Sequence, residues 1–408
     1  MNLLLPLIFI FLIFESLLQH YNLITGYEDE LLVGIIFTYS SIKYGIPKNY
    51  SKLIILFFIF NIFSAYFSKY KFCVDLFLLD SILFLKPFLF FISLKSLNPK
   101  IYNTNFKFIK FISCSFVIGS FLFLPFHYFG DIFEASFFRF DLPAYQFFYT
   151  NPGKFLNIIL ITGLISFSIE KSKYSFLFYF MTLVLIISTL RFKGFILLVP
   201  IILFTSFKPL KEKLYCFVKK KLIERKVFAL KTLIYIVPLA LLFILPAVSK
   251  FNSVFLNTEE GIAPRLMFVY TSLEIFISQF PLGIGPGYFG SAIANMFYSP
   301  LYVDLGWNDI RGLGQDSSVN YLNDNFWPMI MAQYGFLGFL IVLKMFKFFI
   351  YDYLKKILNR PESFLFVFVT MISIITGTFG SATFIGTLGM LYILSNSFGF
   401  GGTNASLI

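Results

Sequence analysis

The sequence is poor in charge, cysteine and histidine. Only 13% of its 408 residues are Asp, Glu, Lys or Arg, which is too few to give soluble helices their polar faces. The three cysteines form no Cys-x-x-Cys pair, so we expect neither disulfides nor a structural zinc site. With two histidines and no cluster of carboxylates at ligand spacing, the chain shows no sign of a metal site or another cofactor.

Apolar residues are abundant instead, at 58% of the chain with 61 Phe. A membrane-spanning helix needs about 20 largely apolar residues, and the sequence predicts about twelve such helices. They lie near residues 3–19, 31–46, 53–67, 76–94, 108–129, 155–170, 175–190, 192–207, 228–248, 326–346, 363–379 and 383–399. We therefore expect an all-α polytopic membrane protein that forms a single integral membrane domain over residues 1–408.

The positive charges predict an orientation. Residues 208–227 carry eight Lys or Arg against two Glu, and cytoplasmic loops are enriched in these cations. We predict a basic cytoplasmic loop there and, with twelve spans, both termini in the cytoplasm. Lys69 and Lys71 fall on the outside in this scheme, against the trend. The formal net charge of +12 thus reflects membrane topology, and the expected partner is anionic lipid rather than nucleic acid.

The longest predicted loop covers residues 249–325. It holds three cations and seven anions, and a loop of this length is usually functional. Pro264 suits the first turn of a helix. The apolar residues that recur after it at helical spacing are Leu266, Tyr270, Leu273, Ile277 and Phe280. We predict that this external loop contains an amphipathic helix over 264–280, lying on the membrane or on the helix bundle.

A glycine-rich run, QFPLGIGPGYFG, follows at residues 279–290. No strand precedes it and no Lys-Ser or Lys-Thr follows it, so it is not a nucleotide-binding loop. We expect a rigid turn that ends the preceding helix and lets backbone approach a membrane-bound substrate closely. Gly285, Gly287 and Tyr288 are its candidate substrate-binding residues.

The chain uses Arg sparingly and mostly outside. Four of the six Arg are predicted to be external: Arg139, Arg191, Arg265 and Arg311. A guanidinium is always charged and binds phosphate or carboxylate through two parallel hydrogen bonds. Arg191 and Lys193 lie in IISTLRFKGF, where one apolar helix ends and the next begins; two cations at membrane depth are costly unless they snorkel, pair or bind a ligand. Arg139 and Arg311 have a simpler explanation, namely pairing with the acidic loop.

Two further groups of polar residues have alternative interpretations. In NDNFWPMIMAQYGFLG, residues 323–338, the loop re-enters the membrane; Asp324 is either the N-cap of that helix or a general base. Asp80 and Lys86 fall within one predicted span. Charges at such depth mark transport pathways by default, yet these two could also neutralise each other across the bundle.

Three elements occur in a fixed order: STLRFKG, then an Arg, a helix and PLGIGPGYF, then DNFWPMIMAQYGFLG. Together they resemble the superfamily of O-antigen polymerases (Wzy type) and O-antigen ligases. Aligned on Gly335, the ligase pattern of His-Asn before Glu-x-Gly meets Asp324, Asn325 and Gln333. The ligase-type His is absent, and the Asp-Asn-Phe form is more similar to polymerases.

The resemblance implies a metal-independent glycosyltransferase of the broad GT-C kind in the bacterial inner membrane, with its active site facing the periplasm. It would move a growing glycan from undecaprenyl diphosphate onto an incoming lipid-linked repeat unit and so build O-antigen (lipopolysaccharide) or capsular polysaccharide; a chain-length regulator protein is a further implied partner. Arg191 and Arg265 would clamp the diphosphate and Asp324 would act as the base. The substrate-binding residues would be Lys193, Arg311, Asn325, Gly285, Gly287 and Tyr288. An O-antigen ligase and a lipid-linked oligosaccharide flippase are the alternatives.

Overall fold

The protein is described by a computed structural model that covers a large part of the chain. The described residues are 7–11, 13–14, 18, 28–70, 73–96, 99–129, 138–139, 142–149, 152–167, 174–191, 194–195, 198, 201–202, 264–310, 312–317, 321–322 and 326–357. They are mostly helical, which confirms the predicted class. The basic loop 208–227, the predicted spans 228–248, 363–379 and 383–399 and four site residues lie outside this set; the four are Lys193, Arg311, Asp324 and Asn325.

The described elements are helices of different lengths and one pair of two-residue strands. The helices are α2 (Glu28–Tyr44), α3 (Lys48–Tyr66), α4 (Val74–Ser96), α5 (Pro99–Phe129), α6 (Pro152–Phe167), α7 (Ser175–Ser188), α11 (Pro264–Ser278), α12 (Ala292–Met296), α13 (Pro300–Asp304) and α14 (Phe326–Ile357). Strands β1 (Phe138–Arg139) and β2 (Leu142–Pro143) pair antiparallel, with Phe138 opposite Pro143.

Within the described residues, four helices are long and apolar enough to cross a membrane. They are α3, α4, residues Phe108–Phe129 of α5 and residues Phe326–Phe348 of α14. The first three match predicted spans, whereas the predicted span 326–346 is divided by a break at Gly335. Helices α2, α6 and α7 also stand where spans are predicted, but they have only 17, 16 and 14 residues. The count of twelve spans stays a prediction.

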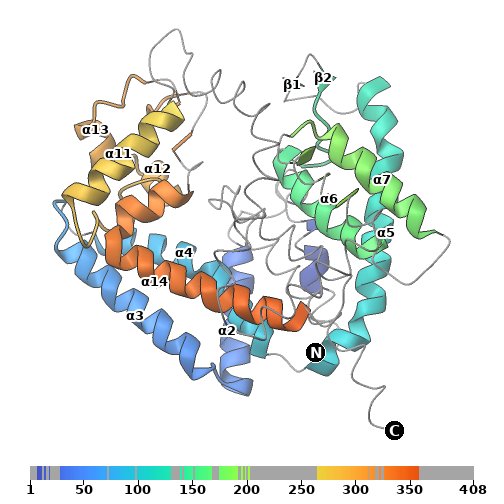
Figure 1. Ribbon diagram of the computed structural model, residues 1–408, viewed down its shortest axis with the longest axis horizontal. Coiled ribbons are helices and arrows are strands. Elements are labelled where there is room, and N and C mark those ends of the chain that lie inside the picture. Colours follow the sequence, from blue (N-terminus) through green and yellow to red (C-terminus); the bar gives the residue numbers. More distant parts are fainter. Residues whose placement is uncertain are drawn as a thin grey trace.

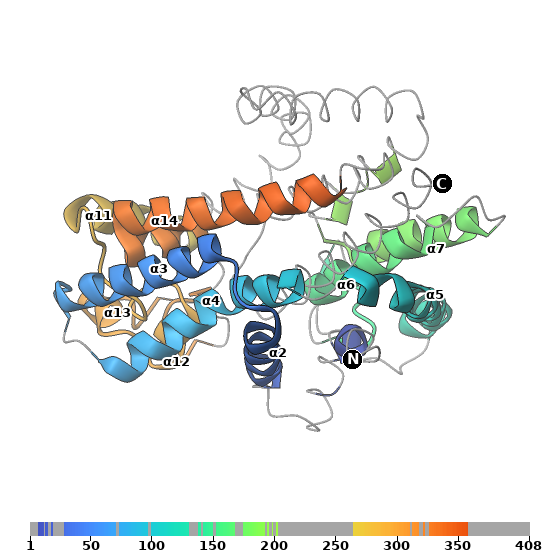
Figure 2. The same cartoon turned by 90° about the horizontal axis from the view of Figure 1, so that it is seen from below.

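The helices form two groups, and one of the three hydrophobic clusters joins them (Figure 1). Helices α3, α4 and α11–α14 make one group, and α5, α6 and α7 pack against one another in the other. The last turns of α4 join them, because Phe90 and Leu94 are buried in one cluster with Tyr145 and Phe155. Figure 2 shows the long part of α14 running beside α3, with which it is in contact.

The outer surface of this bundle is apolar. On α3 the large side chains that remain exposed include Ile55, Ile59, Ile62 and Phe63, on the face opposite to buried Phe57. A soluble protein exposes large apolar residues singly rather than along a whole helix. This face therefore suits a lipid environment, where a helix needs no polar side.

Helix α14 differs from a simple span because it is folded back on itself at Gly335. The backbone there has φ 56° and ψ −160°, outside the helical region. The rings of Phe326 and Trp327 lie 6.0 and 5.9 Å from that of Phe346, whereas a straight helix would hold residues that far apart in the chain roughly 30 Å from each other. A short arm thus ends at Gly335, and the arm from 336 to 357 is by itself roughly 33 Å long, enough to cross a bilayer.

Asp80 and Lys86 of α4 do not neutralise each other. Lys86 is buried and forms an ion pair with Glu30 in the first turn of α2. Residues six apart on a helix point roughly 240° apart around its axis, so Asp80 faces a different neighbour. The pairing considered from the sequence is wrong, and each charge has its own partner.

Candidate functional site

The site centres on the glycine-rich run, which interlocks with the break in α14. A helix broken at Gly335 leaves the carbonyls of Ala332 and Gln333 and the N–H of Leu337 without their usual partners. Three backbone hydrogen bonds replace them. Ile284 N–H donates to Ala332 O (3.0 Å), Gly285 N–H donates to Gln333 O (2.9 Å) and Leu337 N–H donates to Pro281 O (3.1 Å). Irregular backbone is tolerated at membrane depth only when it is satisfied in this way.

Glycine is required on both sides of this contact. Gly283 has φ +75°, and a Cβ placed on it would lie 2.5 Å from both Gln333 O and Gly335 N. A Cβ on Gly335 would collide with Gly283 N and Leu282 C in return. These neighbours are backbone atoms that cannot rotate away, so two glycine turns pack where no other residue fits.

The end of α3 and the residues just after it bind two further carbonyls of the turn. Ser64 Oγ donates to Leu282 O (2.8 Å) and Ser68 Oγ donates to Ile284 O (2.5 Å). Both serines lie at the C-terminal end of α3, more than 200 residues from the turn in the chain. The turn is therefore held by the end of α3 on one side and by α14 on the other.

The connection between α3 and α4 touches the long loop, which accounts for the outlying Lys69. Lys69 Nζ lies 3.8 Å from Asp304 Oδ2, and both side chains are exposed. Tyr70 O–H donates to the same carboxylate (3.0 Å); burial and this hydrogen bond raise the pKa of Tyr70 to about 12. An exposed ion pair contributes little stability. The ion pair is informative about position instead. It shows that the connection between α3 and α4 and the long loop, both predicted to be external, lie on the same side of the bundle.

Asp80 of α4 binds the glycine-rich run through a backbone N–H group. Its side chain is 3% exposed, and its Oδ2 accepts the Gly287 N–H at 2.9 Å. The side chains of Ser291 and Gln333 also lie beside this carboxylate. All three neighbours are neutral, and the Gly287 bond ties α4 to the turn. A buried carboxylate is stable only when its oxygens are satisfied like this.

The sequence did not predict that Asp80 binds the glycine-rich run. The nearest cation in the chain is Lys86, and a pair between these two residues was considered instead. Gln333 extends the network: its Nε2 donates to Phe289 O at 2.7 Å. The same Ser291 that contacts Asp80 also accepts the Ala294 N–H (3.1 Å) as N-cap of α12. The sequence gave only a weak indication of this contact: it has an Asp within an apolar span and, far away in the chain, a turn rich in backbone donors.

We expect Asp80→Ala to lower the free energy of unfolding by about 1–3 kcal/mol, the usual penalty for leaving buried donors unpaired. Asp80→Asn keeps an acceptor for Gly287 N–H, so its free energy of unfolding should lie between those of Asp80→Ala and the wild type. Thermal unfolding of the three proteins in one detergent measures this order. Equal midpoints for Asp80→Ala and the wild type would show that the carboxylate does not hold the turn.

The three candidate substrate-binding residues of the run belong to this framework. The N–H groups of Gly285 and Gly287 are committed to Gln333 O and Asp80, so they do not cradle a phosphate. Tyr288 is buried and stacks on Tyr70 with 5.3 Å between ring centroids; burial raises its pKa. The close backbone approach is to α3 and α4, where a Cβ on Gly285 would lie 3.2 Å from Ala65 Cα. A role in binding substrate stays a prediction.

Helix α11 begins at Pro264, as predicted, but ends at Ser278. Its predicted apolar stripe is exposed, with Tyr270 at 54% and Ile277 at 74%. The buried face is a different one, carrying Phe268 and Ile275, and α11 packs against α14. The helix therefore lies on the bundle, one of the two predicted alternatives, but it does so through a face other than the predicted stripe.

The starts of α11 and α14 converge on one glycine. A Cβ on Gly290 would lie 2.9 Å from both Phe268 Cζ and Met329 Cβ. Phe268 is one turn after Arg265, whose backbone is in α11, and Met329 is one turn after Phe326, the first residue of α14. The structure therefore brings the start of the Arg265 helix and the start of α14 to the same end of the site.

Arg191 lies in the other helix group. It is half-buried and follows α7, after Leu190 with a positive φ of 50°. The chain turns here, since Phe195 N–H donates to Arg191 O (3.2 Å), which confirms the predicted helix junction. The end of α7 is fixed by Tyr145, whose N–H donates to Ser188 O (2.9 Å). His127 is buried beside that tyrosine, with 5.1 Å between ring centroids.

Among the described residues, no three His, Cys, Asp or Glu side chains lie together where they could hold a metal ion. Comparison of the chain with protein-family models, with curated proteins and with solved structures finds no match.

Proposed function

We propose that the protein is a membrane-embedded glycosyltransferase that polymerises oligosaccharide repeat units carried on undecaprenyl diphosphate, at the periplasmic face of a bacterial inner membrane. The products would be O-antigen or capsular polysaccharide. The protein contributes no cofactor to this reaction, because the lipid diphosphate is already an activated leaving group. The enzyme must position a hydroxyl and stabilise the negative charge that departs.

One observation supports the proposal above the others. The second and third elements of the sequence resemblance, the glycine-rich run and the segment around Gly335, are locked together by three backbone hydrogen bonds. The residues that flank these elements, Arg265 and Asp324, are the proposed phosphate ligand and base. Asp324 precedes Phe326 by two residues, which span at most about 7 Å. A rigid junction at the core of the site would hold a cation and a carboxylate at a fixed separation.

The proposed chemistry assigns one step to each group. The acceptor hydroxyl oxygen forms a bond to the anomeric carbon of the donor glycan as the bond from that carbon to the diphosphate oxygen breaks. The hydroxyl proton passes to the Asp324 carboxylate. The electron pair leaves on undecaprenyl diphosphate, where Arg265 and Arg191 would stabilise the charge, assisted by Lys193 and Arg311. Asn325 would orient the acceptor.

The transporter alternative loses its main support. It rested on an Asp80–Lys86 pair within one span, and the two residues bind different partners, Gly287 and Glu30. Both are parts of the packed bundle. Polar groups instead gather where the long loop meets the ends of α3, α4 and α14, which suits a site at the membrane surface.

Removal of the gene tests the proposed function. Without a polymerase, the organism should place single repeat units on the final acceptor, because ligation of one unit does not need elongation. Loss of a ligase would leave that acceptor bare instead. A gel of the extracted glycolipid or glycan separates the two outcomes, and an unchanged ladder of chain lengths would contradict both.

A further inference from the structure

Helix α11 has two apolar faces, one buried and one exposed. Phe268 and Ile275 are buried, and the helix packs against α14. On the opposite side, Tyr270, Leu273 and Ile277 fall within about 60° of one another around the helix axis. These three side chains are 54%, 40% and 74% exposed. A contiguous apolar surface of this kind marks a contact with membrane, with protein or with an apolar ligand.

The exposed stripe continues onto α14. Phe280 follows α11 and is 64% exposed, and its ring lies 5.6 Å from that of Phe336, the first residue after the break in α14. Phe336, Leu340 and Leu343 are exposed along the arm that is long enough to cross a bilayer. The exposed apolar residues of α11 and of this arm therefore form one continuous surface, which we call the α11–α14 track.

The track begins at a cation and then carries little charge. Arg265 is in the first turn of α11. The other charged residue of α11 is Glu274, which is exposed at the edge of the stripe. Residues 279–283 and 336–343 contain no charged residue, and Lys344 follows at the far end. Because α11 alone is about 22 Å long, the track suits a ligand with an anionic head and a long hydrocarbon tail.

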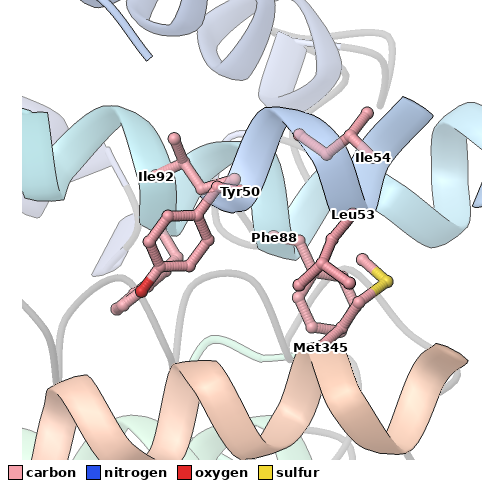
Figure 3. A pocket seen from close by; sticks show the side chains of 7 residues that line it. Tyr50, Leu53, Ile54, Phe88, Ile92 and Met345 are labelled. Atoms are coloured by element: carbon pink, nitrogen blue, oxygen red, sulfur yellow. The ribbon is translucent and has the colours of Figure 1, made fainter. Parts of the chain in front are cut away.

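A hydrocarbon chain cannot enter the bundle through the apolar gap between α3, α4 and α14. The lining of this gap includes Tyr50, Leu53, Phe88, Ile92 and Met345 (Figure 3). All five are at most 8% exposed, and the space among them is about 10 Å³, the size of one water. The gap is closed core, so a tail held by these helices has to lie on an exposed surface such as the α11–α14 track.

We propose that the α11–α14 track binds the polyprenyl tail of the lipid-linked donor glycan. This inference rests on the proposed function, in which the diphosphate of that donor binds at the Arg265 end of α11. The tail runs from there along Tyr270, Leu273 and Ile277, and at Phe280 it passes onto α14 and into the bilayer. Contacts with the tail do not involve the sugars, so they hold the donor equally well whatever the length of its glycan.

Native mass spectrometry of the full-length protein tests the proposal, with undecaprenyl diphosphate and phosphatidylglycerol titrated into one detergent. The wild type should bind undecaprenyl diphosphate in preference to phosphatidylglycerol. Ile277→Gln should weaken undecaprenyl diphosphate about ten-fold, the effect of losing about 1.4 kcal/mol of apolar contact, and should leave phosphatidylglycerol unchanged. Ile59→Gln is the matched control, because Ile59 is 49% exposed on α3 and outside the track; it should bind both lipids as the wild type does.

Labelling in lipid bilayers provides a second measurement that does not depend on detergent. Ile277→Cys should react with a membrane-soluble maleimide above the level of the wild type, which has three cysteines. Added undecaprenyl diphosphate should slow this reaction, whereas added phosphatidylglycerol should not. Resistance of Ile277→Cys to the maleimide without added lipid would overturn the proposal, because another segment or another protein would then cover the stripe.

The binding results separate this inference from the proposed function. If the wild type binds undecaprenyl diphosphate and Ile277→Gln binds it equally well, the tail lies elsewhere and only the inference about the track fails. If Ile277→Gln weakens both lipids alike, the stripe is a general contact with lipid, and the inference fails in the same way. If the wild type does not prefer undecaprenyl diphosphate to phosphatidylglycerol, the proposed function fails together with it.

Discussion

Gly283→Ala is expected to leave little folded protein in the membrane. The new Cβ would enter a left-handed backbone conformation, which costs about 1–2 kcal/mol, and would lie 2.5 Å from Gln333 O and Gly335 N. Relief of that clash requires the turn to separate from α14, and then three backbone hydrogen bonds are lost. Each buried group left unpaired costs about 1–3 kcal/mol. The sum is comparable to the whole stability of a typical protein.

The measurement is the amount of protein that elutes as a single species from size-exclusion chromatography after detergent extraction. Gly119→Ala is the matched control, because nothing lies within 4 Å of a Cβ at that helical position and Ala favours a helix more than Gly does. It should accumulate like the wild type. If Gly283→Ala were equally abundant and equally stable to heat, the interlocked turns would not be what holds this part of the protein together.

Arg265→Ala is expected to abolish the ladder of long glycan chains while the protein stays in the membrane. The variant keeps the buried side chains of α11, among them Phe268 and Ile275, so we expect the helix to stay packed against α14. Loss of a group that stabilises developing negative charge typically lowers a rate 10²- to 10³-fold. Polymerisation at about a hundredth of the normal rate would leave mainly single repeat units on the acceptor.

The assay is gel electrophoresis of the glycan from a strain that carries only the variant gene, with immunoblotting of the membrane fraction. Arg265→Lys keeps the charge but not the two-pronged geometry and should give short chains. Lys69→Ala removes another cation from the same side, whose partner is the exposed Asp304, and should give a normal ladder. A normal ladder from Arg265→Ala at normal protein levels would refute the assignment of Arg265 to the diphosphate.

Local features of the sequence determined the class and most of the helices. Apolar runs of about 20 residues predicted α3, α4 and the second half of α5, because helix formation in an apolar solvent depends on length and composition alone. Pro264 predicted the start of α11, since its fixed φ and missing N–H suit a first turn. The glycine pattern of residues 279–290 predicted a rigid turn for the same kind of local reason.

Only the tertiary structure decided what the turn and the buried charges contact. Asp80 reaches Gly287 across 207 positions of the chain, and Ser64 reaches Leu282 across 218. The apolar pattern around Gly335 is that of one span, yet the backbone folds back there because the glycine-rich run supplies the hydrogen-bonding partners that a broken helix lacks. The sequence by itself thus determined that the chain is helical, apolar and rich in glycine at one turn. Which groups satisfy one another depends on distances in space, and residues hundreds of positions apart set those distances.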